Sequence, residues 1–574
     1  MSEKEIIKRL LSVVYKKKLL LILSFIFAIL SVVLNLLAPI IIGDTIDDFK
    51  ALQSIQRIVP YVIALALVYL SYSLCNWIMM YTSNKIAFSS SALLRKSLYD
   101  KMNRLPISFF DQHAHGDLIS RYINDIDLIS DGLLQGLSTM ISGVVTIVCC
   151  IAIMLYINVI MAMVVIVSAP FTYYVAKTIT KRTQKYFRQQ ATTLGKLNGY
   201  SEEMLSSLKT IKAFHYEQHV QETFEHTNAI LYTSGVKSQF YGSLANPSTR
   251  FVTNVAYAIV GVAGAVLALS GHISVGSISI FLIYSNVFSK PFNEITGVIT
   301  QLQSAIASGR RIFQIQDMEE EKEDATCETL RESTGSITFE DVRFQYQKNQ
   351  KLIEHLYIDI PAGSKVAIVG KTGAGKTTFV NLLMRFYDIQ DGSILIDGQD
   401  VRRYTKDSTR QQFGMVLQDT YLFEDSIAAN IAYGKKDASR EEIIQASKKT
   451  GAHDFIRRLH NGYDTILHAN STSLSQGQRQ LLSITRVVLM DPSILILDEA
   501  TSSIDTRSEQ HVNDAMSLLM QGKTSFIIAH RLSTIIHCDK ILVMEQGNII
   551  EQGTHEELLQ KQGAYASLYQ SQFD

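Results

Sequence analysis

The sequence predicts an α-helical transmembrane domain of six spans, followed by an α/β domain of the P-loop type. Two observations lead to this fold class. Long apolar runs recur up to about residue 300, whereas short strands, polar helices and glycine turns fill the chain beyond about residue 336. In that second part, KVAIVGKTGAGKTTFV places a glycine-rich turn between an apolar strand and a helix.

Length and composition agree with this division. A chain of 574 residues has room for two or more domains. Its residues are 47% hydrophobic and its mean hydropathy is +0.11, which is high for a soluble protein. The 54 basic and 54 acidic residues balance, so the basic excess of a nucleic-acid-binding protein is missing and no nucleic-acid partner is expected. The five cysteines include no CxxC pair, so neither a zinc site nor a disulfide framework is indicated.

Six apolar runs in residues 1–314 are long enough to cross a membrane, which takes about 20 mostly apolar residues. The first run follows YKKK, but it is too long for a signal peptide and no small-residue cleavage site follows it. One such run could be a buried helix of a soluble protein, but six indicate an integral membrane domain. The predicted spans are about 19–42, 57–80, 138–157, 159–178, 251–270 and 274–297.

The loops between these spans predict the orientation. Basic residues gather at Lys4–Lys18, at Arg95–Arg104 after the second span, and at Lys177–Lys212 after the fourth. The loop GDTIDDF after the first span is acidic, and the loops INV and SGHIS have no basic residue. Because basic loops stay inside, both termini are expected in the cytoplasm. The two internal basic loops are long, so we expect them to continue the spanning helices into the cytoplasm.

An acidic stretch separates the two domains. Residues 315–335 contain the stretch QDMEEEKEDATCETLRES, which has no apolar periodicity and is interpreted as a solvated linker. The second domain then covers residues 336–574.

The glycine-rich turn of this second domain has the P-loop pattern. It begins at Gly370 and continues through Lys371, Thr372, Gly373, Ala374, Gly375, Lys376, Thr377 and Thr378. Backbone N–H groups and the positive end of the following helix would bind phosphates. Lys376 would reach the β- and γ-phosphates, and the Thr377 hydroxyl would bind Mg²⁺.

A second buried strand ends in two acids. SILILDEA carries Asp498 and Glu499 at its end. Alone, an apolar strand with an acidic end is common, but beside a P-loop it predicts the Walker B arrangement. Asp498 would then hold Mg²⁺ through water, and Glu499 would polarise the attacking water.

Further motifs follow in a fixed order. They are Tyr346 in VRFQYQ, Gln418 in GMVLQDTYLF, the segment LSQGQRQ, Asp505 in SSIDTRSE and His530 in IIAHRLST. This set resembles the nucleotide-binding domain of ABC transporters. With six spans ahead of it, the whole chain resembles an ABC exporter half-transporter of the bacterial multidrug or lipid type. LPISFFDQHAHGDLISRYINDID and LNGYSEEMLSSLKTIKAF resemble the cytoplasmic loops that dock on the ATPase domains of that family.

The resemblance implies roles for these residues. Tyr346 would stack on adenine, and Gln418 would contact Mg²⁺ and the attacking water. His530 would hold the transition state together with Glu499, and Asp505 would act across a dimer interface. The chain has no Asn-Lys-x-Asp guanine signature, so ATP is the expected nucleotide.

In this family two nucleotide-binding domains sandwich two ATP molecules, each between one chain's P-loop and the other chain's signature. Ser475, Gly477 and Gln478 keep the signature, but Gln476 replaces its first glycine. Glutamine is acceptable at a helix start, so we expect the ATP contact to survive. The variant resembles exporters built from two different halves, which favours a second ABC half-transporter as partner and makes this chain the catalytically complete half. A homodimer stays open.

The stretch LHANSTS before the signature, residues 467–473, departs from the family pattern because it has no acid and no glycine. That stretch normally contacts the membrane domain, so the change affects the expected coupling, implies a partner with matching changes, or is neutral drift.

The expected function is ATP-driven export of an amphipathic drug, lipid or peptide across the bacterial cytoplasmic membrane. The alternatives are a homodimeric lipid flippase, for which membrane lipid is the partner, and a non-transporting ATP-dependent membrane sensor. Glu499 and His530 disfavour the sensor. Four residues within the spans could line a pathway or simply pack helices: Asn35, Asn76, Trp77 and Asn286. No cluster of charges within the spans identifies a cargo.

Overall fold

The computed structural model describes residues 1–52, 58–321, 327–347, 352–417, 420–468, 474–498, 506–528 and 535–570. The chain forms two compact units. The first comprises Met1–Arg104 and His113–Met318, and the second comprises Leu105–Gln112 and Glu319–Asp574. The short segment Leu105–Gln112 therefore belongs by its contacts with the second unit, although the sequence placed it within the membrane domain.

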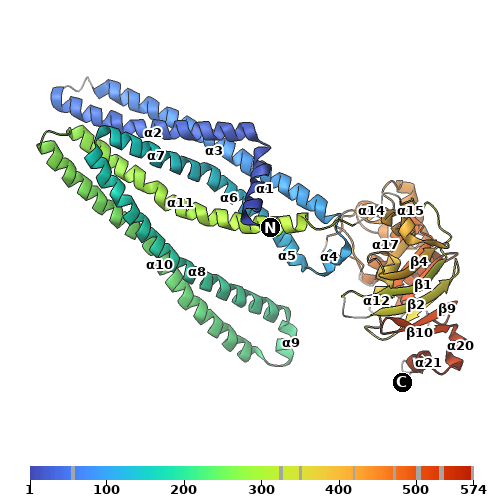
Figure 1. Ribbon diagram of the computed structural model, residues 1–574. Coiled ribbons are helices and arrows are strands. Elements are labelled where there is room, and N and C mark those ends of the chain that lie inside the picture. Colours follow the sequence, from blue (N-terminus) through green and yellow to red (C-terminus); the bar gives the residue numbers. More distant parts are fainter. Residues whose placement is uncertain are drawn as a thin grey trace. The chain divides into compact units, whose positions relative to one another are not determined.

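The first unit is helical throughout its described residues (Figure 1). Its helices are α1 (Glu3–Tyr15), α2 (Lys18–Leu52), α3 (Ile58–Met102), α5 (His115–Ser120), α6 (Ile126–Gln135), α7 (Ile141–Ile157), α8 (Val159–Ser206), α9 (Leu208–Ala213), α10 (Glu217–Leu269) and α11 (Val275–Gln316). Two π-helical turns, Arg121–Asp125 and Gly136–Met140, connect α5, α6 and α7. The longest helix, α10, has 53 residues. At about 1.5 Å per residue it measures roughly 80 Å, more than twice the ~30 Å of a hydrocarbon core.

The six predicted spans fall on α2, α3, α7, α8, α10 and α11. Among the described residues, four segments are long and apolar enough to cross a membrane: Lys18–Phe49, Ile58–Met102, His115–Ile157 and Arg250–Leu269. The spans at 159–178 and 274–297 remain predictions, because they include residues whose side chains lie outside the description. Helices α3, α8 and α10 continue far beyond their apolar runs, as the long basic loops suggested, and α11 also continues beyond its own apolar run.

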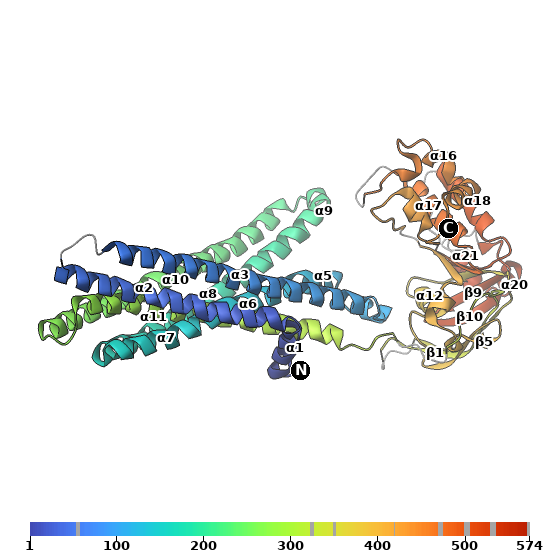
Figure 2. The same ribbon diagram turned by 90° about the horizontal axis from the view of Figure 1, so that it is seen from above.

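Two pairs of long helices lie side by side: α2 with α3, and α8 with α10 (Figure 2). Helix α11 packs on α2 and α7. The buried Tyr284 of α11 donates a hydrogen bond to the Leu36 carbonyl of α2 at 2.6 Å. Asn158 separates α7 from α8 and caps α8, because its side chain accepts from the Met161 N–H at 3.1 Å.

The first helix is amphipathic and packs beside α11. Ile6, Leu10 and Val14 recur at helical spacing and are buried. Arg9 donates two hydrogen bonds to Asp317, at 2.7 and 2.6 Å. This bidentate pair fixes α1 to the end of α11.

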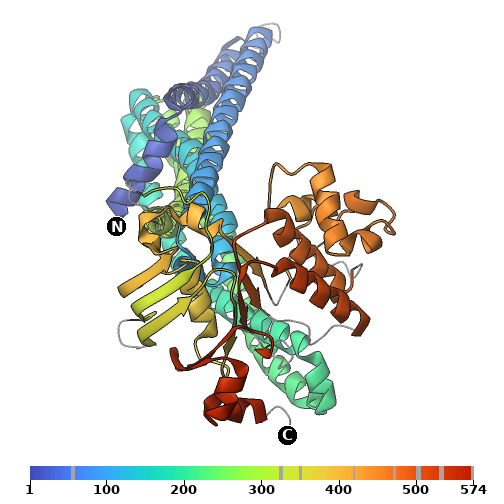
Figure 3. The same cartoon turned by 90° about the vertical axis from the view of Figure 1, so that its right-hand side faces the viewer.

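The second unit contains two sheets (Figure 3). The antiparallel sheet has the order β2-β1-β4-β5, formed by β1 (Ile337–Phe344), β2 (Ile353–Ile360), β4 (Asp391–Ile396) and β5 (Gln399–Asp400). The other sheet has the order β10-β9-β3-β8-β7-β6, formed by β3 (Lys365–Val369), β6 (Phe413–Val416), β7 (Ile494–Asp498), β8 (Thr524–Ile528), β9 (Lys540–Glu545) and β10 (Asn548–Gly553). It is parallel except for the β9–β10 hairpin.

Alternation along β3 builds a core on each face of the larger sheet. Val366 and Ile368 pack with the antiparallel sheet and α12 (Lys376–Leu383), whereas Ala367 and Val369 pack with the helices on the other face. The helices of this unit are α4 (Ile107–Asp111), α12, α13 (Lys406–Arg410), α14 (Ile427–Ala432), α15 (Arg440–Lys449), α16 (Ala452–Ile456), α17 (Gln476–Met490), α18 (Thr506–Leu519), α20 (His555–Gln560) and α21 (Ala564–Gln570).

The linker is less solvated than its composition suggested. Arg410 donates two hydrogen bonds to Glu321, at 3.2 and 2.6 Å, and the buried Lys406 lies 3.2 Å from the same carboxylate. Leu330 is buried, and its N–H donates to the Ser408 hydroxyl at 3.1 Å. Two points of the described linker are therefore fastened to α13: Glu321 by an ion pair with basic residues, and Leu330 by a backbone hydrogen bond to Ser408.

Candidate nucleotide-binding site

The P-loop connects β3 to α12 through backbone conformations that favour glycine. Gly373 has φ +84° and Gly375 has φ +102°, both in the left-handed region. A Cβ atom on Gly375 would lie 2.9 Å from the Gly547 Cα, so space as well as conformation requires glycine there. A Cβ on Gly370 would lie 2.4 Å from the Met544 carbonyl oxygen. The loop is thus held tightly against the β9–β10 turn.

Lys376 is the first residue of α12, and its ammonium lies inside the loop. Its Nζ donates to the Gly370 carbonyl at 2.5 Å. Burial lowers the pKa of Lys376, and the negative charge of Asp498 opposes that change. A phosphate bound in the loop would therefore lie next to this ammonium.

Asp498 is placed by the sheet. It ends β7 and pairs with Ile528 of β8, and Ile528 in turn pairs with Ile368 of β3. The carboxyl ends of these parallel strands therefore share the edge from which the P-loop leaves, which is where ligands bind in such sheets.

The residues present at this edge fit a magnesium ion. Thr377 is exposed in the first turn of α12, and Asp498 is close enough to Lys376 for their charges to interact. A hydroxyl and a carboxylate are oxygen ligands, and Mg²⁺ completes its shell with water and phosphate oxygens. The described residues contain no group of three or more His, Cys, Asp or Glu that would hold a metal without such help.

Four predicted site residues lie outside the described residues: Gln418, Glu499, Asp505 and His530. The described strands before three of them end at the same edge. Val416 of β6 pairs with Leu497, next to Asp498, and β8 ends at Ile528 opposite Asp498. The roles of the four residues stay predictions.

Tyr346 is oriented by polar and aromatic neighbours. Its hydroxyl donates to the Thr378 hydroxyl at 3.3 Å and accepts from the Asn381 amide at 3.2 Å, so both contacts come from α12. Its ring packs edge-on against Phe344 and Tyr387, with centroids 4.8 and 4.9 Å apart. The side chain is nevertheless 44% exposed, which leaves surface for a base to stack on. Sequence reasoning missed Asn381, which lies one turn along α12 from Lys376.

Tyr387 connects Tyr346 to α4. Its ring is nearly perpendicular to that of Tyr346, and its hydroxyl donates to Asp111 of α4 at 2.6 Å. Burial and the Asp111 carboxylate raise the pKa of Tyr387, so it stays a hydrogen-bond donor at physiological pH. Asp111 lies in one of the two loops that resemble the docking loops of the family, but sequence reasoning did not find Tyr387, because no motif includes it.

The signature residues form a helix start. Ser475 caps α17: its hydroxyl accepts from the Gln478 N–H at 3.3 Å, and the Gln478 side chain accepts from the Ser475 N–H at 3.0 Å. Gln476 is the first residue of α17 and has no positive φ, so glutamine fits its backbone conformation. Gly477 is buried in the first turn. Residues 469–473 of the altered stretch before it lie outside the described residues.

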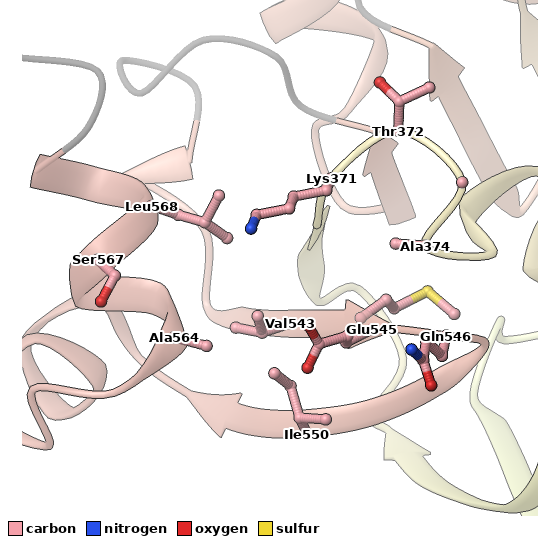
Figure 4. A pocket seen from close by; sticks show the side chains of 12 residues that line it. Lys371, Thr372, Ala374, Val543, Glu545, Gln546, Ile550, Ala564, Ser567 and Leu568 are labelled. Carbon is pink, nitrogen blue, oxygen red and sulfur yellow. The ribbon is translucent and has the colours of Figure 1, made fainter.

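A cavity of about 420 Å³ lies on one side of the P-loop (Figure 4). It is lined by Lys371, Thr372, Gly373 and Ala374 of the loop, by residues of β9 and β10, and by Ala564, Ser567 and Leu568 of α21. The Lys371 side chain reaches across it toward Leu568, with Glu545 on the opposite wall. Lys371 thus faces this cavity, whereas Lys376 turns to the carbonyl oxygens of its own loop. Any contact of Lys371 with a nucleotide is therefore expected from its backbone.

Two family profiles match the chain. Residues 21–292 match the ABC transporter transmembrane region, and residues 353–502 match the ABC transporter domain. A Bacillus subtilis ABC transporter ATP-binding protein, YfiC, is 42% identical over 571 residues, which cover 99% of this chain and 94% of the relative. The chain belongs to the ABC transporters. It is an ABC exporter half-transporter, an integral membrane protein that couples ATP hydrolysis to transport.

Two other ABC proteins bear on the function. A fatty acid ABC transporter ATP-binding/permease protein of Mycobacterium tuberculosis is 41% identical over 518 residues, covering 90% of this chain and 81% of the relative. The solved structure of a bacterial Atm1-family ABC exporter with ATP bound is similar with a TM-score of 0.78 and 28% identity, covering 96% of this chain and 98% of that one.

Proposed function

We propose that this half-transporter exports an amphipathic substrate across the bacterial cytoplasmic membrane, as one half of a dimer with both termini in the cytoplasm. The single observation that carries the proposal is the continuity of the chain. Helices of up to 53 residues, far longer than a bilayer is thick, share one polypeptide with a complete P-loop and a capped signature helix. Such helices can carry motion from the nucleotide site to the spans.

We propose ATP and Mg²⁺ as the cofactors. The Gly370–Thr378 loop, Lys376 and the exposed face of Tyr346 form the side that holds ATP. Thr377 and Asp498, with Gln418, would hold Mg²⁺, whose charge offsets that of the phosphates. Glu499 and His530 would act on the attacking water and the γ-phosphate.

The partner is proposed to be a second ABC half-transporter, with a different chain favoured over a second copy. The capped start of α17, with Ser475, Gly477 and Gln478, would meet the nucleotide of the partner. The glutamine at position 476 supports two unequal halves, because it resembles the signature variants of such pairs. A homodimeric lipid flippase is the second candidate, since the helical conformation of Gln476 is compatible with a working signature in both copies.

The proposed substrate class is an amphiphile. The Mycobacterium relative is named for fatty acids, and the same chemistry, an apolar chain with a polar head, suits the amphipathic substrate proposed here. A non-transporting sensor stays disfavoured, because a sensor need not keep Glu499 and His530.

The proposal is tested by ATP-dependent uptake into inverted membrane vesicles, with oleate and a lipophilic cationic dye as probes. We expect uptake of at least one probe, lost in Glu499→Gln. ATP hydrolysis without uptake of either probe would contradict the proposed export.

A further inference from the structure

Polar side chains from four helices of the first unit surround a cavity of about 150 Å³. Each helix contributes two polar residues that are four positions apart, so each pair lies on one helix face. The pairs are Ser31 and Asn35 on α2, Tyr72 and Asn76 on α3, Ser142 and Thr146 on α7, and Lys290 and Glu294 on α11. All four pairs fall within predicted spans, where polar groups are costly unless they have a use.

The serine and threonine hydroxyl groups of this cavity are already satisfied by their own helices. Ser31 donates to the Ala28 carbonyl at 2.9 Å, Ser142 to the Ser138 carbonyl at 2.6 Å, and Thr146 to the Ser142 carbonyl at 2.7 Å. These three residues therefore pack without needing a ligand.

The two amides and the phenol of this cavity are not satisfied in this way. Within the part of the chain that the structure describes, Asn35, Asn76 and Tyr72 have no hydrogen-bond partner, although all three are half-buried in the cavity wall. Each amide offers two N–H donors and one acceptor, and the phenol offers one O–H donor. Polar residues that only pack membrane helices would bond to one another across the helices. Three unpaired groups that converge on one cavity indicate a ligand instead.

Lys290 adds a positive charge. Its nearest carboxylate oxygen, on Glu294, is 3.9 Å away, and the two side chains are 77% and 43% exposed. So loose a pair contributes little and leaves the ammonium able to bind another anion. Pro291 has no N–H and cannot donate to the Val287 carbonyl, and both residues also line the cavity.

The size of the cavity limits what it can hold. Sites for drug-sized molecules usually have roughly 300–1,000 Å³. A volume of about 150 Å³ fits a small head group and a few waters, so an attached apolar chain would have to lie outside it.

We propose that this cavity binds the anionic head group of the exported amphiphile, a carboxylate or a phosphate. Lys290 supplies the charge, and Asn35, Asn76 and Tyr72 donate hydrogen bonds. Donors outnumber acceptors among the unpaired groups, which favours an anion, and Glu294 stays beside Lys290 on α11. This inference rests on the proposed export function and adds to it the sign of the head-group charge.

The test uses the full-length transporter, with any chain that co-purifies, in nanodiscs of phosphatidylcholine. Four amphiphiles are titrated while ATP hydrolysis is measured: oleate, dodecyl phosphate, oleyl alcohol and oleylamine. We expect one or both anions to change the rate at lower concentration than the alcohol or the amine. The comparison of oleate with dodecyl phosphate tells whether carboxylate or phosphate is preferred.

Variants then locate the response. Lys290→Gln should raise the midpoint concentration for the active anion about tenfold, as expected for losing a hydrogen bond to a charged group. Lys290→Arg keeps the charge and should retain most of the response, so a folding defect can be told from a lost contact. Lys85→Gln on α3 and Asn286→Ala on α11 lie outside the cavity lining and should leave the midpoint unchanged.

Two results would overturn the subsite alone and leave export standing. One is a wild-type response confined to the alcohol or the amine, and the other is an unchanged midpoint in Lys290→Gln. A wild type whose rate responds to none of the four amphiphiles would overturn the proposed export of amphiphiles, and this subsite with it.

Discussion

Gln476 occupies the first position of α17, where the family usually has glycine. The position has helical backbone, and the helix start is already stabilised by the reciprocal bonds of Ser475 and Gln478. Glycine at this point would only add freedom to the unfolded chain. The glutamine therefore changes the side chain at this position and not the backbone conformation.

Gln476→Gly is therefore predicted to keep ATP hydrolysis within about twofold and to lower stability by up to about 1 kcal/mol, the cost of glycine in a helix. Thermal unfolding and steady-state hydrolysis check this. The matched variant Ser475→Ala removes the cap, which costs about 1 kcal/mol, and should also reduce hydrolysis. A manyfold gain in the glycine variant would show that the glutamine side chain obstructs the partner's nucleotide.

Glu499→Gln is predicted to lower hydrolysis at this chain's P-loop at least ~100-fold, the usual contribution of a general base, while ATP still binds. Rate and nucleotide-binding assays on the same preparation separate the two effects. Lys376→Ala is the contrasting variant and should lose binding as well. Undiminished turnover in Glu499→Gln would remove that residue from the mechanism.

Two elements far apart in sequence meet at Tyr387. Helix α4 supplies Asp111, and the segment after α12 supplies Tyr387, whose ring also supports Tyr346. The nucleotide site and a docking-loop helix thus share one side chain. We expect this contact to relay adenine binding to α4.

Tyr387→Phe keeps the ring packing on Tyr346 and loses only the hydrogen bond to Asp111. The predicted result is an ATP KM within about twofold of wild type and a weaker response of hydrolysis to transported substrate, since a bond to a charged group contributes about 1.5–3 kcal/mol before solvent screening. Tyr387→Ala, which also removes the ring, should raise the KM. A phenylalanine variant with full substrate response would contradict the relay.

The linker contact gives a prediction on pH. Burial alone would raise the pKa of Glu321, but the hydrogen bonds and charges of Arg410 and Lys406 outweigh it and lower the pKa below its ordinary 4.5. The contact therefore stabilises the second unit above about pH 4.5, and this stabilisation is lost as the pH falls through the folded-state pKa.

Glu321→Gln should lower the unfolding temperature at neutral pH and flatten its decline on acidification below pH 4.5, as measured by thermal unfolding. Glu332→Gln, an exposed linker change, should leave the profile unaltered. Identical acid profiles for wild type and Glu321→Gln would rule out this role of the linker.

The sequence could predict those features that consecutive residues form by themselves. The strand, glycine turn and helix around Lys376 are such features, and so are the apolar strand before Asp498 and the long membrane helices. Asn381, Tyr387 and Glu321 could not be found in this way, because their roles depend on partners distant in the chain.

The membrane cavity likewise could not be predicted from the sequence. The sequence offered Asn35 and Asn76 as single polar residues and showed no charge cluster. Only the packing of α2, α3, α7 and α11 brings these amides near Lys290 and Tyr72. Trp77 and Asn286, equally polar or aromatic candidates, are exposed and do not line that cavity.

We propose that this chain hydrolyses ATP as one of two half-transporters in a shared particle. The most direct test is the ATPase rate of the full-length chain in lipid, alone and with any co-purifying chain, alongside the mass of the particle. We predict hydrolysis only by particles that contain two half-transporters, and loss of this hydrolysis in Glu499→Gln. A single chain that hydrolyses ATP at the full rate would contradict it.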